Sequence, residues 1–486
     1  MLAYAPLGWF PLIWLTLGGL FGLLGLAATP RQGACLGAAF GFGLFLAGVS
    51  WVYVSLSVFG GMPAPLAGLA TFLFCAVLTI FPTLVGGLFV RFASAGWLRR
   101  ALLFAALWVL AEWLRGWLFT GFPWLAVGYA QAPPSPLAGF APVFGVYGVS
   151  LLSVLLGALL FDVLKGRFTG QSLSTQRIPL LAVGALLLAG GLLSEVQWTE
   201  AQGEPLSVAL LQGNVPQDMK WRPEKFTDSL RIYYRLALEH PAQLTVLPET
   251  ALPAFLDQVP GEYLDELKKL ALRQQGDMLF GIALADAAGG QSRYANAAVS
   301  LGASPLQTYR KSHLVPFGEF VPAGFAWFLS MAHIPMSDFT PGESRQAPMR
   351  LAGQLVGANI CYEDAFGEEI IHALPEASLL VNLSNVAWFG DSLAPAQHLQ
   401  IAQMRALETG RMMLRATNTG MTAIVAVDGR VQAVLPPFTR AALLGEVRGY
   451  AGSTPFVRWG NWPAIILALL LAGLTGRRNS RAAHPI

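Results

Sequence analysis

The sequence predicts a polytopic α-helical membrane domain joined to an α/β domain that lies outside the cytoplasm. Hydrophobic residues make up 54% of the 486 residues and charged residues only 12%, about half the charged share of a soluble domain. Apolar runs concentrate in residues 1–195, and the positive charges lie on one side of them. Residues 196–455 instead alternate short β-branched runs with amphipathic stretches, which is typical of strands alternating with helices.

Seven apolar runs are candidates for crossing a hydrocarbon core, which takes about 20 helical residues. We expect a bundle of six spans in residues 1–195, and a final span with a basic cytoplasmic tail in residues 456–486. Buried helices of a soluble core are the alternative, but the runs lack a polar stripe. The spans are expected near residues 7–28, 34–57, 65–90, 101–120, 140–164, 178–195 and 461–475.

Lys and Arg orient these spans, because positive charges beside a span are retained in the cytoplasm. With the first residue outside, ten basic residues fall in cytoplasmic loops or the tail, and only Arg115 falls in a short outside loop. All of residues 196–455 are then outside the cytoplasm. No basic stripe with interleaved aromatics accompanies the net charge of +3, so nucleic acid is not an expected partner. The ten residues are Arg31, Arg91, Arg99, Arg100, Lys165, Arg167, Arg177, Arg477, Arg478 and Arg481.

Residues 196–455 are expected to form one domain, because nothing resembling a linker divides them. Asp428-Gly429 supplies the positive φ angles of a tight hairpin turn. Strands are predicted at 207–212, 244–247, 278–284, 295–301, 355–360, 379–383 and 422–427. Helices are predicted near 224–239, 261–275, 365–374 and 395–410.

Cys361 ends the apolar run 355–360 and is followed at once by the polar cluster 362–364. The other two cysteines, Cys35 and Cys75, lie in long apolar stretches, where a thiol behaves as a small hydrophobic group. A disulfide or cysteine–metal framework is therefore not expected, and the histidines lack zinc-ligand spacing. Taken alone, Cys361 fits a buried structural thiol better than a nucleophile. Two further segments reverse that preference.

Glu249 and Lys311 supply the chemistry that a nucleophilic thiol needs. Glu249 ends an apolar strand, and Lys311 lies in a loop constrained by two prolines and a glycine. Attack on a carbonyl requires the thiolate, so a base such as Glu249 must take the proton. The Lys311 ammonium and the backbone N–H of Tyr362 would then stabilise the oxyanion. Each charge alone fits an ordinary surface role, but together they predict covalent catalysis.

The motifs around these residues resemble those of the nitrilase superfamily. They are Pro-Glu-Thr at 248–250, Lys-Ser-His-Leu-Val-Pro-Phe-Gly-Glu-Phe at 311–320 and Ile-Cys-Tyr-Glu at 360–363. The resemblance implies an αββα sandwich in which Glu249 is the base, Lys311 stabilises the oxyanion and Cys361 is the nucleophile. Fusion to membrane spans that carry Gly-Gly-Met-Pro at 60–63 and Gly-Phe-Pro-Trp-Leu at 121–125 resembles the apolipoprotein N-acyltransferase family.

That second resemblance implies a substrate class and a location. The family transfers the sn-1 acyl chain of a phospholipid, typically phosphatidylethanolamine, through a cysteine thioester to the N-terminal amine of a lipoprotein's diacylglyceryl-cysteine. No cofactor or metal is implied, and a monomer is expected. The implied location is the bacterial inner membrane, with the catalytic domain on the periplasmic side. Residues implied to support the site or to lie near the acyl cleft are Glu319, Tyr362, Glu363, Trp221 and Trp388.

Two departures from the family accompany the resemblance. The family usually has eight spans, whereas this chain starts at what resembles the second of them, so either a span is missing or seven suffice. Val386 stands where the family usually has Asp, so no acidic supporting role is assigned there. The apolar segment 325–336 is too short to span a membrane, and it fits a packed segment as well as an interfacial flap.

Two other functions remain open at the level of sequence. A membrane-tethered nitrilase-type amidase or hydrolase would use the same three residues with water as the acceptor. A transporter or scaffold with an extracytoplasmic sensor would instead need buried charges within its spans. Glu112 and Arg115 are the obvious candidates for such charges.

Overall fold

The computed structural model describes residues 1–170, 173–216, 223–286, 293–322 and 338–476. The chain divides into two compact units. The helical unit comprises Met1–Ser50, Gly68–Gln197 and Arg458–Ile486, and the sheet unit comprises Trp51–Ala67 and Trp198–Val457. Trp221 and the apolar segment 325–336 lie outside the described residues.

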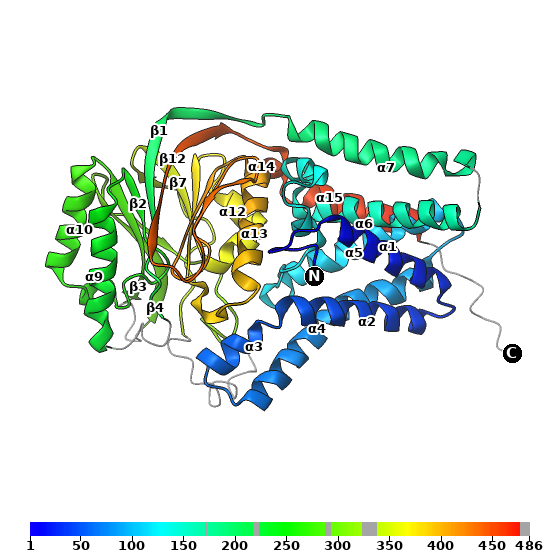
Figure 1. Ribbon diagram of the computed structural model, residues 1–486, viewed down its shortest axis with the longest axis horizontal. Coiled ribbons are helices and arrows are strands. Elements are labelled where there is room, and N and C mark those ends of the chain that lie inside the picture. Colours follow the sequence, from blue (N-terminus) through cyan, green and yellow to red (C-terminus); the bar gives the residue numbers. More distant parts are fainter. Residues whose placement is uncertain (171–172, 217–222, 287–292, 323–337, 477–486) are drawn as a thin grey trace. The chain divides into compact units, whose positions relative to one another are not determined.

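A helix overlies each of the seven apolar runs. Among the described residues, five helices are long and apolar enough to cross a membrane, and α1 and α15 are shorter apolar helices. Within the helical unit, α6 packs against α1, α5 and α7, and α15 packs against α5 and α6. The helices are α1 (Pro11–Leu26), α2 (Pro30–Val49), α4 (Ala64–Phe92), α5 (Trp97–Trp117), α6 (Ala141–Phe168), α7 (Leu173–Ser194) and α15 (Trp462–Thr475) (Figure 1).

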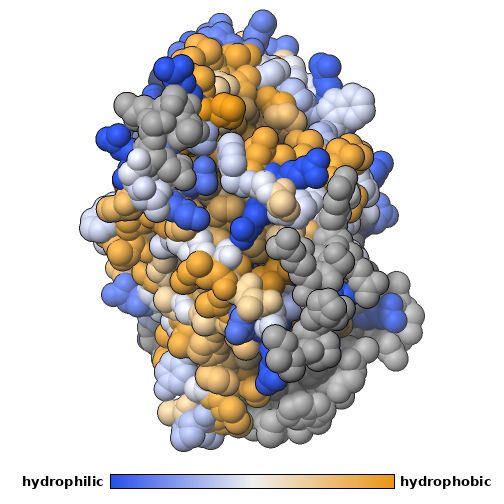
Figure 2. Space-filling model, turned by 90° about the vertical axis from the view of Figure 1, so that its right-hand side faces the viewer, coloured by the Kyte–Doolittle hydropathy of each residue, from blue (hydrophilic) through white to orange (hydrophobic). Residues whose placement is uncertain are grey.

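Large apolar side chains are exposed along these helices. On α4, for example, Phe72, Val77 and Ile80 are about half exposed. Figure 2 shows hydrophobic residues covering wide areas of one face of the molecule, with hydrophilic residues between them. Lipid tails are as apolar as these side chains, so their exposure is compatible with a membrane and costly in water.

Close backbone approach joins α2 to α4. A Cβ added at Gly33 would overlap the backbone carbonyl of Gly86, and one added at Gly86 would overlap that of Gly33. One turn along α2, a Cβ at Gly37 would overlap the carbonyl of Pro82. Small residues at such crossings let membrane helices pack backbone against backbone.

Glu112 and Arg115 hold the irregular segment that follows α5. The guanidinium of Arg115 donates to the carbonyls of Phe122 and Trp124, each at 2.6 Å, and a carboxylate oxygen of Glu112 accepts from the N–H of Val127 at 2.8 Å. Both charged side chains are buried. Backbone groups without a regular helix to satisfy them need such partners inside a membrane protein. The two charges therefore have a structural role in this unit.

The sheet unit contains two six-stranded sheets. The first has the order β12-β1-β2-β3-β4-β5 and the second the order β11-β10-β9-β8-β7-β6. In the first, the strands are β12 (Ala441–Gly452), β1 (Thr199–Gln212), β2 (Leu244–Val246), β3 (Asp277–Asp286), β4 (Arg293–Gly302) and β5 (Thr308–Arg310). In the second, they are β11 (Val431–Val434), β10 (Ala423–Val425), β9 (Met413–Thr417), β8 (Leu379–Ser384), β7 (Gln354–Ile360) and β6 (Met349–Leu351).

The sheets stack face to face, with helices on both outer sides (Figure 1). Helices α9 (Pro223–Glu239) and α10 (Gly261–Arg273) cover the first sheet, and α13 (Ala394–Thr409) covers the second. The core between the sheets is built from buried aliphatic side chains of both, including Val208, Val246, Leu279, Val356, Val381 and Leu414. The αββα sandwich expected from the sequence is therefore confirmed.

Parallel strands at the centre of each sheet position the functional segments. β1, β2 and β3 are parallel neighbours, as are β7, β8 and β9. Side chains just beyond the carboxyl ends of such strands line the ligand crevice of open α/β sheets. Glu249 follows β2, Cys361 follows β7 and Asn385 follows β8.

Several expected boundaries differ from those observed. The span expected at 34–57 ends as a helix at Val49, because residues 51–67 fold with the sheet unit. The helix expected at 365–374 is reduced to α12 (Gly367–Ile370) and a 3-10 turn, and Pro375 follows them. Strand β9 was not predicted, since Arg415 interrupts its apolar pattern. Strand β12 was missed because its residues alternate between buried and exposed beside several charges.

Candidate active site

The backbone places Cys361 at a sharp exit from β7. Cys361 opens a 3-10 turn, Cys361–Ala365, and its φ of 54° lies in the left-handed region that residues other than glycine rarely adopt. Such strain persists only where the surrounding structure enforces it, and it is common at functional sites. Because of this turn, the Cys361 side chain no longer follows the alternation of side chains between the two faces of β7.

The Cys361 thiol is protonated at neutral pH. Burial, and after it the negative charge of Glu249, raise the pKa of this thiol to about 12. Lys311 acts in the opposite direction, because its positive charge favours the thiolate. A thiol in this state needs a base to become a nucleophile.

Lys311 is a buried cation between two carboxylates. Its Nζ lies 2.8 Å from Oε1 of Glu319 and 3.5 Å from Oε1 of Glu249. Burial by itself would lower the pKa of Lys311, but the charges of Glu319 and Glu249 outweigh it and raise that pKa above its usual value. The side chain is only 1% exposed, so its charge is held in place and screened little by solvent.

Asn296 joins the two carboxylates and was not singled out from the sequence. Its amide nitrogen donates to Oε1 of Glu249 at 2.7 Å and to Oε1 of Glu319 at 2.8 Å. The other oxygen of Glu249 accepts from the N–H of Asn385 at 2.8 Å, so both oxygens of this carboxylate are oriented. The available signal in the sequence was a polar amide inside a mostly apolar predicted strand, 295–301.

Glu363 joins the end of β7 to the loop that carries Lys311. One carboxylate oxygen accepts from the N–H groups of Ser312 at 2.7 Å and His313 at 3.1 Å, and the other accepts from the N–H of Ile360 at 2.6 Å. The hydroxyl of Tyr309 lies 3.0 Å from both oxygens. Burial raises the pKa of Glu363, and the backbone N–H donors oppose that shift.

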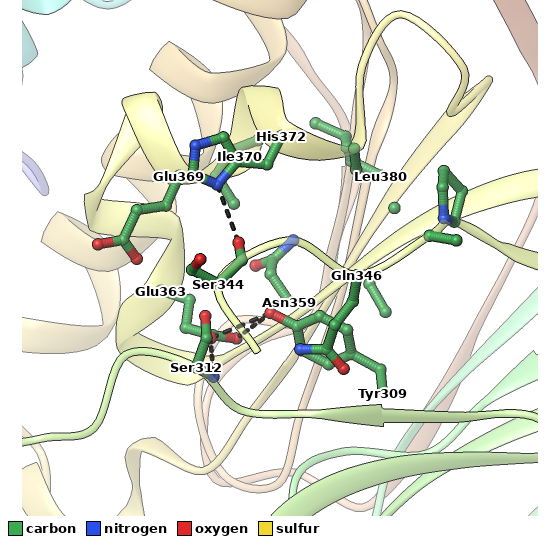
Figure 3. A pocket seen from close by; sticks show the side chains of 15 residues that line it. Tyr309, Ser312, Ser344, Gln346, Asn359, Glu363, Glu369, Ile370, His372 and Leu380 are labelled. Atoms are coloured by element: carbon green, nitrogen blue, oxygen red, sulfur yellow. Dashed lines mark hydrogen bonds between the residues drawn. The ribbon is translucent and has the colours of Figure 1, made fainter. Parts of the chain in front are cut away.

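A small cavity of about 30 Å³ lies beside Glu363 and is lined by Tyr309, Ser312 and Asn359 among others. Figure 3 shows the hydroxyls of Tyr309 and Ser312 directed at the Glu363 carboxylate. Ligand sites for small molecules have volumes of several hundred Å³. This cavity is therefore too small for either a lipid or a peptide.

Trp388 lies in the 3-10 turn Val386–Phe389 that follows β8. Its carbonyl accepts from the hydroxyl of Ser55 at 2.7 Å, and its ring packs edge-on against Phe59 at 6.1 Å. Val386, in the same turn, is buried and apolar. Residues 51–59 thus pack against the turn that follows Asn385, a direct partner of Glu249.

Apart from Trp221 and Trp388, the predicted site residues fall into two groups. Glu249, Lys311 and Glu319 are in direct contact, and the thiol of Cys361 lies within the electrostatic influence of all three. Tyr362 and Glu363 follow the thiol in the same turn, and the Tyr362 ring packs edge-on against Phe366 at 5.0 Å. Within the ranges that the structure describes, no group of three His, Cys, Asp or Glu side chains could hold a metal ion.

Comparison with known proteins covers both units. Residues 1–159 match the apolipoprotein N-acyltransferase N-terminal domain, and residues 207–456 match the carbon-nitrogen hydrolase family. The chain is 51% identical to an apolipoprotein N-acyltransferase of Nitrosomonas europaea, over 98% of this chain and 96% of the relative. It is 47% identical to that of Methylococcus capsulatus, over 99% of this chain and 94% of the relative.

Among solved structures, a carbon-nitrogen hydrolase from Helicobacter pylori is 18% identical, with a TM-score of 0.37 over 56% of this chain and 95% of that one. The alignments with the two acyltransferases span both the helical unit and the sheet unit, at 51% and 47% sequence identity. Proteins that are this similar over nearly their full length share a family. The chain therefore belongs to the apolipoprotein N-acyltransferase family.

Proposed function

We propose that this protein transfers an acyl chain from a phospholipid to the N-terminal amine of the diacylglyceryl-cysteine of lipoproteins. The observation that carries the proposal is the buried contact of Lys311 with Glu249 and Glu319, in the electrostatic range of the Cys361 thiol. This is the set of groups that acyl transfer through a thioester requires: a nucleophile, a base and a fixed cation. The names of the relatives, which align over both units, support the same reaction.

The first half-reaction forms a thioester on Cys361. Glu249 takes the thiol proton as Sγ attacks the carbonyl carbon of the sn-1 ester, and the resulting oxyanion is stabilised by Lys311 and by the N–H of Tyr362. The intermediate collapses with cleavage of the ester C–O bond. Protonated Glu249 gives its proton to the departing lysophospholipid oxygen. The raised pKa of the thiol makes this base necessary at neutral pH.

The second half-reaction transfers the acyl group to nitrogen. The lipoprotein amine attacks the thioester carbonyl, Glu249 accepts a proton from that amine, and the same two groups stabilise the second oxyanion. Cleavage of the C–S bond releases the amide, and the proton on Glu249 returns to sulfur. A thioester is activated towards amines, so one difficult exchange becomes two easier steps.

The donor, the location and the association state belong to the same proposal. Phosphatidylethanolamine is the proposed acyl donor, and the protein acts as a monomer in the bacterial inner membrane, with the sheet unit on the periplasmic side. The distribution of Lys and Arg around the apolar helices supports this orientation. Glu319 and Glu363 are proposed to hold the Lys311 loop, and Trp221 and Trp388 to lie near the acyl chain.

Mass spectrometry of the Cys361 peptide tests the proposal. Purified protein in detergent micelles that contain phosphatidylethanolamine should gain the mass of one acyl chain on Cys361. A diacylated lipopeptide should then remove it and gain the same mass at its amine. Cys361→Ala should show neither change while keeping the parent's melting temperature. Release of free fatty acid with no stable acyl group would show a hydrolase instead, and a Cys361→Ala variant that still transfers would overturn the proposal.

A further inference from the structure

The backbone carbonyl of Cys361 is held by two side chains that do not belong to the proposed reacting groups. Nδ2 of Asn382, on β8, donates to this oxygen at 3.1 Å. Nε2 of His398, on α13, lies 3.3 Å from the same oxygen. Both side chains are at most 2% exposed, so these contacts are made away from solvent on the side of Cys361 that faces β8 and α13.

A buried ion pair fixes the orientation of both donors. Asp364 binds Nε2 of His398 through Oδ1 at 2.7 Å and the guanidinium of Arg415 through Oδ2 at 2.9 Å. The same Arg415 nitrogen donates to Oδ1 of Asn382 at 2.7 Å, which turns the Asn382 amide nitrogen towards Cys361. Asp364 and Arg415 are at most 1% exposed. His398 and Asn382, the two donors to the Cys361 carbonyl, are thus each held by a further hydrogen bond.

The contacts also define the proton on His398. Burial and the nearby charge of Arg415 lower the pKa of His398, so the ring is neutral and carries one N–H. Nε2 faces a carboxylate oxygen and a carbonyl oxygen, both of which only accept hydrogen bonds. The ring proton therefore lies on Nε2, between Asp364 and Cys361.

We propose that His398 and Asn382, held by Asp364 and Arg415, are positioning residues that set the plane of the Cys361–Tyr362 peptide for oxyanion stabilisation. In a trans peptide the C=O and N–H groups point in opposite directions. Anchoring the Cys361 oxygen towards β8 and α13 therefore aims the Tyr362 N–H away from them. It also stabilises the left-handed φ of 54° at Cys361. The inference rests on the proposed function, in which that N–H contacts the oxyanion.

Substitutions at His398 separate positioning from general support of the fold. His398→Leu removes the donor, and His398→Gln keeps an N–H near the place of Nε2. His372→Leu is the matched control, because Nδ1 of His372 also bonds a backbone carbonyl, that of Ser344 at 2.9 Å, but outside this network. Three quantities are measured in the full-length protein: Cys361 acylation by phosphatidylethanolamine in a single turnover, Cys361 alkylation by iodoacetamide, and the melting temperature.

Acylation passes through an oxyanion and alkylation does not, so the two rates should respond differently. We expect His398→Leu to slow acylation roughly tenfold, the effect of losing about one hydrogen bond, with an unchanged KM for the phospholipid. Alkylation should stay at the parent rate. His398→Gln should recover most of the acylation rate, and His372→Leu should behave as the parent.

Equal slowing of acylation and alkylation in His398→Leu, or acylation at the parent rate, would overturn the proposal. If His398→Leu does not fold, Asn382→Asp provides the same test. It keeps the shape and the Arg415 partner but replaces by an acceptor the amide nitrogen that donates to the Cys361 carbonyl and also to Oδ1 of Asn359. Acylation as fast as in the parent would then reject the inference. A parent protein whose Cys361 is not acylated at all would instead reject the proposed function, and the two failures are thus distinguishable.

Discussion

At the residue scale, two opposite charges act on the Cys361 thiol. Glu249 raises the pKa of this thiol and Lys311 lowers it. Glu249→Gln should therefore lower the pKa and speed alkylation of Cys361 by iodoacetamide at pH 8, whereas Lys311→Met should raise the pKa and slow it. Acyl transfer should fall about 100-fold or more in both, because one loses the base and the other the cation.

The rate of Cys361 alkylation should also depend on pH. A thiol with a pKa of about 12 is mostly protonated through pH 10, so the parent's alkylation rate should rise steadily from pH 6 to pH 10 without a plateau. Mass spectrometry of the Cys361 peptide over time gives each rate. A plateau near pH 8 in the parent, or alkylation that changes in the same direction in both variants, would contradict the electrostatic account.

Asn296 offers a second prediction at this scale. Asn296→Leu removes the amide shared by the carboxylates of Glu249 and Glu319. The two carboxylate oxygens would keep Lys311 as a donor, and losing the Asn296 hydrogen bonds to these buried charged groups should cost about 2 kcal/mol in the free energy of unfolding. Asn296→Asp should cost more, since it has the same shape but adds a third negative charge near Lys311. Denaturant unfolding in detergent measures both, and a Leu variant as stable as the parent would refute the bridging role.

At the element scale, the α2–α4 crossing depends on glycine. A methyl group at Gly33 or Gly86 would overlap the opposing backbone, which cannot move aside as a flexible side chain would. Gly33→Ala and Gly86→Ala should each lower the free energy of unfolding by about 1–3 kcal/mol, an amount typical of overpacking. A lower melting temperature in detergent would show this loss.

Gly43→Ala is the control within the same helix, because nothing lies within 4 Å of a Cβ added there. It should be neutral or slightly stabilising, since alanine favours the helix more than glycine does. A Gly43 variant that loses as much stability as the Gly33 variant would show that the crossing is not the cause.

At the scale of the whole molecule, the prediction concerns the sides of the membrane on which the sheet unit and the loop between α1 and α2 lie. Leu306, 64% exposed, belongs to the sheet unit, and Ala28 is exposed between α1 and α2. In a background that carries Cys35→Ser and Cys361→Ala, Leu306→Cys should react with a membrane-impermeant maleimide in cells whose outer membrane has been made permeable. Ala28→Cys should react only after the inner membrane is disrupted. Labelling of both in intact inner membranes would contradict the orientation.

The fold class was predictable because its signals are local. Apolar runs and the alternation of short strands with amphipathic helices are visible in windows of about 10–20 residues. Glu249, Lys311 and Cys361 could be singled out for the same reason, since each lies at the end of a strand or in a constrained loop. The chemical roles of these three residues stay predictions, whereas their proximity in space is observed in the structure.

The tertiary structure alone decided which distant residues complete the site. Asn296 contacts Glu249 from 47 positions away, and the N–H of Asn385 does so from 136 positions away. Arg415 in β9 is buried in an ion pair with Asp364, 51 positions earlier, so the charge that interrupts the apolar pattern of this strand is neutralised inside the fold. Residues 51–67 join the sheet unit for the same kind of reason, through contacts such as the Trp51 indole with Gln397. Sequence periodicity reports which face of an element is apolar, but the partners of buried polar groups are set by how the chain folds back on itself.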